Sequence, residues 1–252
     1  MSDEKALTKE IAEQFLADSE SVDLSEFAAI EDAAAERLRK QRRSPAGQNA
    51  LPFWRVRATL DLNRLTEISD ADAESFGKHK GDLHLNGLTT LSDAAADSLG
   101  RLQGGRFGWA RWFLFIRRKA RRDLHLDGLT ELSDAGAESL SKHKGWLSLD
   151  GLTELSDAAA ESLSKHKGDL HLNGLTELSD AGAESLSKQP AERVMEDELR
   201  GRYLNGDLSL DSLMELSDVA AESLQRHKGN LYLDVDKIPE SAAQILRDAG
   251  HE

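Results

Sequence analysis

The feature that most constrains this chain is an internal repeat of 23 residues. The block Leu-Ser-Leu-Asp-Gly-Leu-Thr-Glu-Leu-Ser-Asp-Ala-Ala-Ala-Glu-Ser-Leu-Ser-Lys-His-Lys-Gly begins at Leu147 and returns in nearly the same form at Leu170. A unit of this length cannot bury its leucines alone, so the units must stack into a common core. Marked by the first Leu of each Leu-x-Leu, clear copies start at Leu60, Leu83, Leu124, Leu147, Leu170, Leu208 and Leu231, and a degenerate copy starts at Val22.

Each repeat predicts a strand, a turn and a helix. Leu-x-Leu alternates with period two, as in a half-buried strand, and the Asn-Gly or Asp-Gly that follows turns the chain. Ser156 is a good helix N-cap, and Asp157 favours the first helical turn. The next-but-one residue, Ala159, occupies a position that varies between repeats, so we expect it to face water. The segment 165–167, Lys-His-Lys, is expected to place cations at the helix end, with Gly168 as the C-cap.

Stacking these units predicts an α/β solenoid. We expect an arc of about eight strand–turn–helix repeats, with a parallel sheet on one face and short helices on the other. Residues 1–21 predict an N-terminal capping helix with Ile11, Phe15 and Leu16 on its apolar face, and residues 22–252 form the solenoid. Residues 234–252 are expected to cap its C-terminal end.

The repeat resembles a leucine-rich repeat. Its Leu-x-Leu, the spaced leucines after it and the Ala-rich helical segment are similar to the 23-residue bacterial repeats of the Treponema/BspA-like class. The resemblance covers about residues 22–246 without the inserts and implies a binding scaffold without catalytic residues. One departure is expected to matter. Gly87, Leu88 and Thr89 stand where that family carries the Asn that builds an internal ladder.

Three inserts interrupt the repeats, at about 41–58, 101–122 and 188–206. All three follow a helix and precede the next strand, so they are expected to project from one edge of the solenoid. The third insert predicts a helix that begins at Pro190 and carries Met195, Leu199 and Tyr203 on one stripe.

The charge of the chain is divided unevenly. Residues 37–57 carry seven basic residues and residues 101–122 carry eight, with no acidic residue in either segment. Because the whole chain has a net charge of −14, the remainder carries −29. An acidic scaffold with two basic, aromatic inserts is a pattern typical of a surface that recognises a partner.

The basic inserts are the first candidate docking surface, because Trp, Phe and Arg are enriched at interface hot spots. The same side chains can also stack on bases and pair with phosphates, or lie on an anionic membrane. Alternatively, the aromatic side chains pack beneath the insert and the arginines neutralise the acidic solenoid. The candidate residues are Phe53, Trp54, Arg55, Arg57, Trp109, Arg111, Trp112, Phe113, Phe115, Arg117, Arg118, Arg121 and Arg122.

The strand face is the second candidate surface, predicted to be concave, polar and acidic with Trp146 at its centre. It suits a basic partner segment. A divalent metal held by its histidines and aspartates is a weaker alternative, since a repeat duplicates histidines without selecting for metal, and we predict no metal site. The candidate residues are His84, His125, Asp127, Trp146, Ser148, Asp150, His171 and Tyr232.

The function predicted from these features is that of a non-catalytic scaffold or adaptor that binds another protein. No nucleotide-binding, hydrolase or metalloprotease motif occurs, and we predict neither an enzyme nor a cofactor. Binding of nucleic acid or an anionic membrane through residues 101–122 is the alternative, and self-association between acidic and basic surfaces is a further possibility. The chain has no Cys and its first residues lack a secretory pattern, so a cytoplasmic location is expected.

Overall fold

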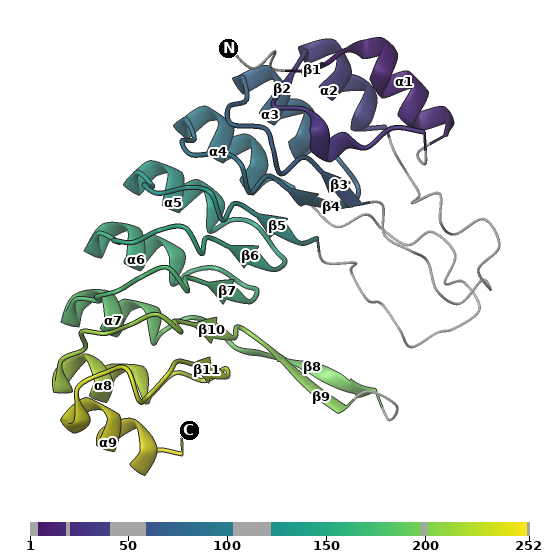
Figure 1. The fold of residues 1–252 in the computed structure, drawn as a ribbon. Coiled ribbons are helices and arrows are strands. Elements are labelled where there is room, and N and C mark those ends of the chain that lie inside the picture. Colours follow the sequence, from purple (N-terminus) through teal and green to yellow (C-terminus); the bar gives the residue numbers. More distant parts are fainter. Residues whose placement is uncertain (1–4, 19–20, 41–58, 103–121, 198–200, 251–252) are drawn as a thin grey trace.

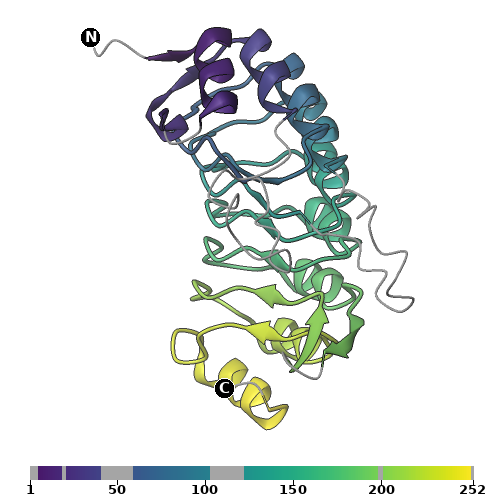
Figure 2. The same ribbon diagram turned by 90° about the vertical axis from the view of Figure 1, so that its right-hand side faces the viewer.

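The computed structural model describes residues 5–18, 21–40, 59–102, 122–197 and 201–250. Within these ranges the repeats stack into an arc with a seven-stranded parallel sheet on its inner side and helices on its outer side (Figure 1). Figure 2 views the arc from the sheet side and shows the strands stacked in order between the two ends. The α/β solenoid predicted from the repeat is therefore confirmed.

The strands coincide with the seven clear repeat copies. The first Leu of each Leu-x-Leu pairs with its counterpart in the next repeat, as Leu83 does with Leu124 across the second insert and Leu170 with Leu208 across the third. The second and third inserts therefore leave the register of the stacked repeats unchanged. In sheet order the strands are β3 (Thr59–Asp61), β4 (Asp82–His84), β5 (Leu124–His125), β6 (Leu147–Ser148), β7 (Leu170–His171), β10 (Leu208–Ser209) and β11 (Leu231–Tyr232).

The helices begin where the sequence places their N-caps. In the repeats that follow β3 to β10, a Ser side chain accepts a hydrogen bond from the third helical N–H, as Ser156 does from Ala159 at 3.0 Å. Each helix is short because two turns suffice to return the chain to the sheet. These helices are α3 (Asp70–Gly77), α4 (Asp93–Gly100), α5 (Asp134–Leu140), α6 (Asp157–Leu163), α7 (Asp180–Leu186) and α8 (Asp218–Leu224).

The core contradicts one prediction about the helices. The position of Ala159 was expected to face water because it varies, but Ala159, Gly136 and Asp72 are all buried there. The position lies against the neighbouring helix, since a Cβ on Gly136 would stand 3.8 Å from the Cβ of Ala96. Asp72 is tolerated because its carboxylate accepts hydrogen bonds from the backbone N–H and hydroxyl of Ser69. The variation therefore reflects a choice among residues that fit between helices.

The Lys-His-Lys segments also differ from their prediction. His143, His166 and His227 are buried rather than exposed at the helix ends, and each Nε2 lies 2.8–2.9 Å from a backbone carbonyl oxygen of the preceding turn of the stack. Burial, and secondly the neighbouring His143, lower the pKa of His166 to about 4, so it is neutral at pH 7. Gly168 is not a helix C-cap either, because α6 ends at Leu163 with Ser164 as its cap.

The N-terminal end departs from the repeat. The unit at Val22 supplies α2 (Asp32–Leu38), but a 3₁₀ helix (Leu24–Glu26) replaces the strand expected there. Instead β1 (Ala6–Leu7) pairs in parallel with β2 (Ala29–Ile30) as a separate two-stranded sheet. The predicted capping helix is α1 (Lys9–Ala17), which buries Phe15 but leaves Leu16 exposed.

The C-terminal end of the described chain is a helix. Helix α9 (Glu240–Asp248) buries Ala242 and Leu246 against the last repeat. Arg247 forms ion pairs with Asp236 and Glu240, which tie the end of this helix to the loop before it. In the described part of the chain, no helix is long and apolar enough to cross a bilayer.

The third insert is a β-hairpin, so the predicted helix is wrong. Strand β8 (Glu192–Asp197) pairs antiparallel with β9 (Gly201–Asn205), with Val194 opposite Tyr203. The insert leaves the stack after Gln189 and re-enters it at Asp207, next to the strand it left. A hairpin returns the chain to its starting point, which a single helix cannot do. Figure 1 shows this hairpin projecting from the stack beside β10.

Candidate functional site

The concave face of the sheet presents one outward side chain from each strand. The register aligns Asp61 with His84, His125 with Ser148 and Ser209 with Tyr232, so the expected stripe runs along the arc. We call these positions the concave stripe: Asp61, His84, His125, Ser148, His171, Ser209 and Tyr232.

Four rings form a continuous stack on this stripe. The ring centroids of His84 and His125 lie 4.4 Å apart, those of His125 and Trp146 lie 6.1 Å apart, and those of Trp146 and His171 lie 4.2 Å apart. Trp146 precedes its strand, and its indole occupies the place in the row that a histidine fills in the adjacent repeats. Ser148 is small and buried at that point, which leaves room for the indole. We call His84, His125, Trp146 and His171 the ring stack.

The ring stack is accessible to a partner. Trp146 is 37% exposed, and Tyr232, further along the stripe, is 48% exposed. Trp146 therefore gives this stretch of the sheet an aromatic side chain that a partner can reach.

Carboxylates flank the ring stack on both sides. One row precedes the strands and the other follows them, and Asp127 lies 3.9 Å from the His125 ring through its Oδ2 and the ring Nδ1. Burial and, secondly, the nearby His125 lower the pKa of His84, which keeps that end of the stack neutral. The face is therefore an aromatic strip with acidic margins. The flanking aspartates are Asp82, Asp123, Asp169 and Asp207 directly before Leu-x-Leu, and Asp127, Asp150 and Asp211 directly after it.

The row that follows the strands is an internal ladder, which corrects the expectation that Gly-Leu-Thr replaces it. Asp127 Oδ1 accepts a hydrogen bond from the backbone N–H of Asp150 at 3.3 Å, and Asp150 Oδ1 accepts one from Asn173 at 2.9 Å. Equivalent hydrogen bonds join three further pairs, in which the side-chain Oδ1 of the first residue accepts from the backbone N–H of the second. These pairs are Asn63 and Asn86, Asn86 and Asp127, and Asn173 and Asp211. The ladder residue is the Asn or Asp directly after Leu-x-Leu, ahead of the Gly. Asp127 and Asp150 thus each use one carboxylate oxygen to join their repeat to the next one.

This ladder predicts different outcomes for two substitutions of one residue. Asp150→Ala removes the acceptor for the Asn173 N–H and is expected to cost about 1–2 kcal/mol of unfolding free energy. Asp150→Asn keeps the acceptor, as Asn86 and Asn173 do naturally, and is expected to change stability by less than about 0.5 kcal/mol. Urea denaturation measures both. Equal losses in the two variants would show that the hydrogen bond contributes nothing.

The structure places only one residue of the predicted insert surface. Arg122 is 8% exposed, and its carbonyl oxygen lies 2.8 Å from the His143 ring, so little of this residue is open to a partner. The other insert candidates lie outside the described residues and stay predictions: Phe53, Trp54, Arg55, Arg57, Trp109, Arg111, Trp112, Phe113, Phe115, Arg117, Arg118 and Arg121.

The concave histidines and aspartates do not converge on a point. In the ranges described above, no group of three or more His, Asp or Glu side chains is arranged to hold a metal ion. The rings present faces and edges to one another instead, as aromatic side chains do when they pack together.

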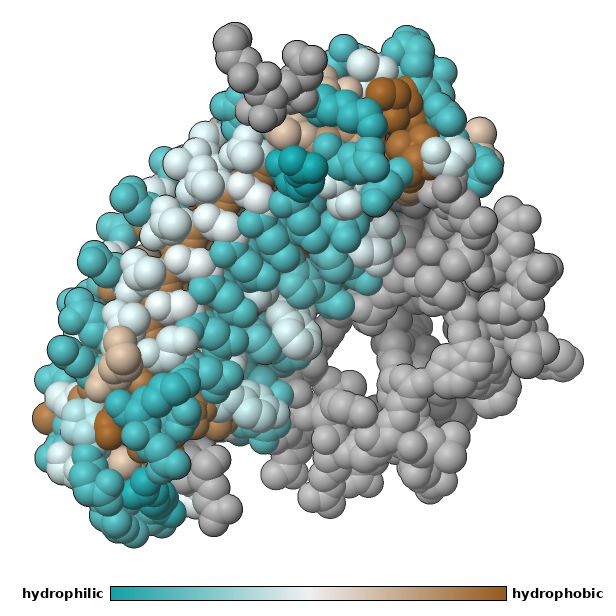
Figure 3. All heavy atoms as spheres, viewed as in Figure 1, coloured by the Kyte–Doolittle hydropathy of each residue, from teal (hydrophilic) through white to brown (hydrophobic). Residues whose placement is uncertain are grey.

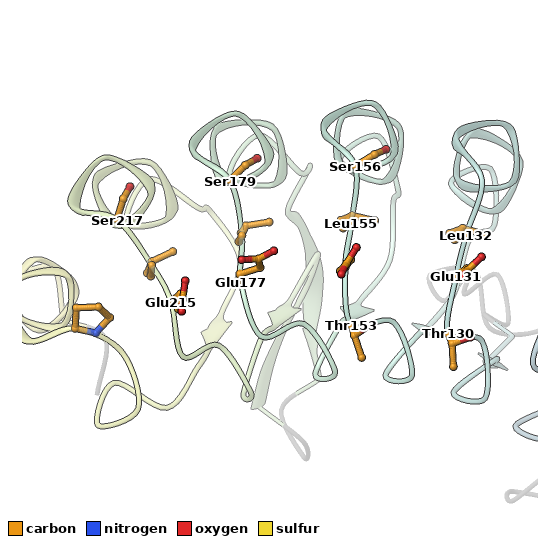
Figure 4. A pocket seen from close by; sticks show the side chains of 14 residues that line it. Thr130, Glu131, Leu132, Thr153, Leu155, Ser156, Glu177, Ser179, Glu215 and Ser217 are labelled. Atoms are coloured by element: carbon orange, nitrogen blue, oxygen red, sulfur yellow. The ribbon is translucent and has the colours of Figure 1, made fainter.

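A second surface was missed by sequence reasoning. A groove of about 1160 Å³ runs along the side of the solenoid between the strand ends and the helix starts, where each repeat passes through Leu-Thr-Glu-Leu-Ser (Figure 4). The signal was present as a glutamate that returns at one position of the repeat. This glutamate could not be assigned to a groove from the sequence, because the groove depends on the distance between neighbouring repeats in the folded structure. The glutamates are Glu131, Glu154, Glu177 and Glu215.

Comparison with known proteins adds no family to these observations, and the resemblance to bacterial leucine-rich repeats stays a prediction. No protein-family model matches the chain, and no curated protein matches it.

Proposed function

We propose that this protein is a cytoplasmic, non-catalytic scaffold that binds another protein through the concave stripe. The observation that carries the proposal is the ring stack, a row of half-buried rings around the exposed Trp146 with carboxylates on both sides. The parallel sheet of the repeats is rigid, so little of the binding free energy is spent on ordering this surface when a partner binds.

The chemistry of the stripe favours a basic segment of the partner. The aspartates on either side of the ring stack give charge complementarity with lysine and arginine side chains. The exposed part of the Trp146 indole offers apolar contact to the aliphatic stems of these side chains. Nucleic acid is disfavoured on this face because its phosphates would meet the same carboxylates. The basic inserts remain a proposed second contact, and their positive charge favours an acidic segment of a partner.

Two variants test the proposal while keeping the stacking of the repeats. Trp146→Asp combined with Ser148→His gives this repeat the Asp-Leu-His-Leu strand found at Asp123 and Asp169, and so removes the indole while keeping the repeat pattern. Asp127→Asn combined with Asp150→Asn removes two charges but keeps the ladder acceptors. Pull-down from native lysate at moderate salt is expected to lose the captured protein with either variant.

The controls separate this surface from the rest of the molecule. Glu161→Gln combined with Glu184→Gln removes the same charge from exposed positions on α6 and α7, and is expected to retain capture. Deletion of residues 103–121 tests whether the second insert is needed for capture. Capture that survives both concave variants but fails with the deletion would overturn the concave site. Capture of nucleic acid or anionic vesicles with a steep salt dependence would favour the alternative function.

A further inference from the structure

The lateral groove is open because the two sides of the solenoid have different spacings. Adjacent strands lie about 4.8 Å apart, whereas packed helices lie about 8–10 Å apart, so the segments that connect them diverge. At the C-terminal end the segments still meet, and the backbone N–H groups of Met214 and Glu215 both donate to the Thr176 oxygen. The repeats before that end leave an accessible channel that crosses several units.

The floor of the groove is aliphatic. Leu132 and Leu155 are only partly buried, while Leu178 and Leu216 close the floor towards the C-terminal end and Pro239 ends it. Figure 3 shows hydrophobic residues, in brown, among a line of near-neutral residues, in white, that follows the arc, with hydrophilic residues on either side. A repeated leucine in each unit thus offers a row of apolar contacts along the solenoid.

The margin of the groove is acidic. Figure 4 shows Glu131, Glu177 and Glu215 in a row on the strand side of the leucines, with the N-cap serines on the helix side. Glu154 completes the row, and no Lys or Arg is found among the described residues that line the groove. The Asp that follows each N-cap serine adds negative charge and offsets the positive end of the helix dipole.

We infer that the lateral groove binds a peptide segment of a partner that carries aliphatic side chains on one face and lysine or arginine beside them. The aliphatic side chains contact the leucine floor, and the cations pair with the glutamate row. Charge complementarity selects this occupant over an acidic or neutral segment. The site is separate from the concave stripe, since it is built from the segments that follow the strands rather than from the sheet.

The experiment titrates the full chain into a short fluorescein-labelled peptide that alternates leucine and lysine, at low salt. Glu154→Lys combined with Glu177→Lys is expected to weaken binding about tenfold, because both rim contacts are lost and reversed. Glu161→Lys combined with Glu184→Lys is the matched control. It makes the same change in net charge in the same two repeats, on exposed helix positions, and is expected to weaken binding less than about twofold.

The apolar contact has its own test. Leu155→Ala leaves the charge unchanged and is expected to weaken the leucine–lysine peptide several-fold, and a serine–lysine peptide of equal charge is expected to bind more weakly than the leucine–lysine peptide. Thermal denaturation verifies that each variant is folded. Equal weakening by the groove and control pairs, or equal binding of the two peptides, would mean nonspecific attraction and would overturn the inference. Absence of any binding by the folded chain would overturn it as well.

Discussion

Replacing Gly151 with Ala is expected to destabilise the solenoid by about 3 kcal/mol, whereas Gly136→Ala is expected to stabilise it by up to about 1 kcal/mol. Gly151 follows the ladder aspartate in the turn after β6. A Cβ at this position would lie 2.2 Å from the backbone oxygen of Asp127 and 2.7 Å from that of Leu129. Both atoms belong to the preceding repeat, so relief of the clash requires two repeats to move apart.

Gly136 lies in α5, where the added methyl group meets only side chains. Its Cβ would stand 3.0 Å from Leu132 Cδ1 and 3.0 Å from Ser133 Oγ. The repeat of α6 carries Ala159 at this position beside the equivalent Leu and Ser, which shows that these neighbours accommodate a methyl group. Alanine is also the better helix former.

Urea denaturation of the two variants measures the difference, and Gly182→Ala in α7 provides a second helical comparison. Neither Gly151 nor Gly136 has a positive φ, so backbone strain does not enter. A stable Gly151→Ala protein would contradict the close stacking of the turns. A loss of stability in Gly136→Ala would contradict the fit between the helices.

Acidification is expected to weaken the solenoid through its buried histidines. The pKa of His166 is about 4 in the folded protein and about 6.5 in the unfolded chain, so the unfolded chain takes up a proton first as the pH falls. The contribution to stability is therefore complete above about pH 6.5 and is lost progressively towards about pH 4. From this residue the expected loss is about 2 kcal/mol between about pH 7.5 and pH 5. Burial lowers the pKa of His143 too, in the same direction.

Gln189 shows which substitution removes this dependence. It occupies the histidine position of its repeat, and its Nε2 donates to the Gly168 oxygen at 2.8 Å, as the His166 ring meets Gly145. His166→Gln is therefore expected to retain stability at about pH 7.5 and to lose less of it at about pH 5 than the parent protein does.

Urea midpoints at the two pH values test this expectation. His171→Gln, a change on the half-buried concave stripe, controls for the loss of a histidine as such. An unchanged pH dependence in His166→Gln would show that this residue is not the proton acceptor. A large loss of stability at the higher pH would show that glutamine does not replace the ring.

Much of the fold follows from spacing within the chain. The Leu-x-Leu copies mark the seven strands, and the serines mark the helix starts, because both signals operate over a few neighbouring residues. Amphipathic spacing also indicated a helix at each end, where α1 and α9 lie, although Leu16 is exposed. For the concave stripe, the alternation of each strand was sufficient to place His84, His125 and His171 on one face.

The contacts between repeats needed the tertiary structure. Ala159 and His166 are both buried, and His166 meets the backbone oxygen of Gly145, 21 positions earlier in the chain. The pattern of residues within one repeat does not indicate whether such a space between repeats is filled. The same holds for Trp146, whose stacking between His125 and His171 depends on the small Ser148 beside it. It also holds for the lateral groove, which exists because strands and helices repeat at different distances.

By itself, the sequence determined the repeat, its register and the start of each helix, since these depend on residues close together in the chain. Only the tertiary structure decided which side chains are buried between repeats, that Asp and Asn form a ladder, and that the third insert is a hairpin. The physical reason is that stacking brings together atoms from successive turns of the solenoid, and their fit depends on the distance between turns rather than on the order of residues within one.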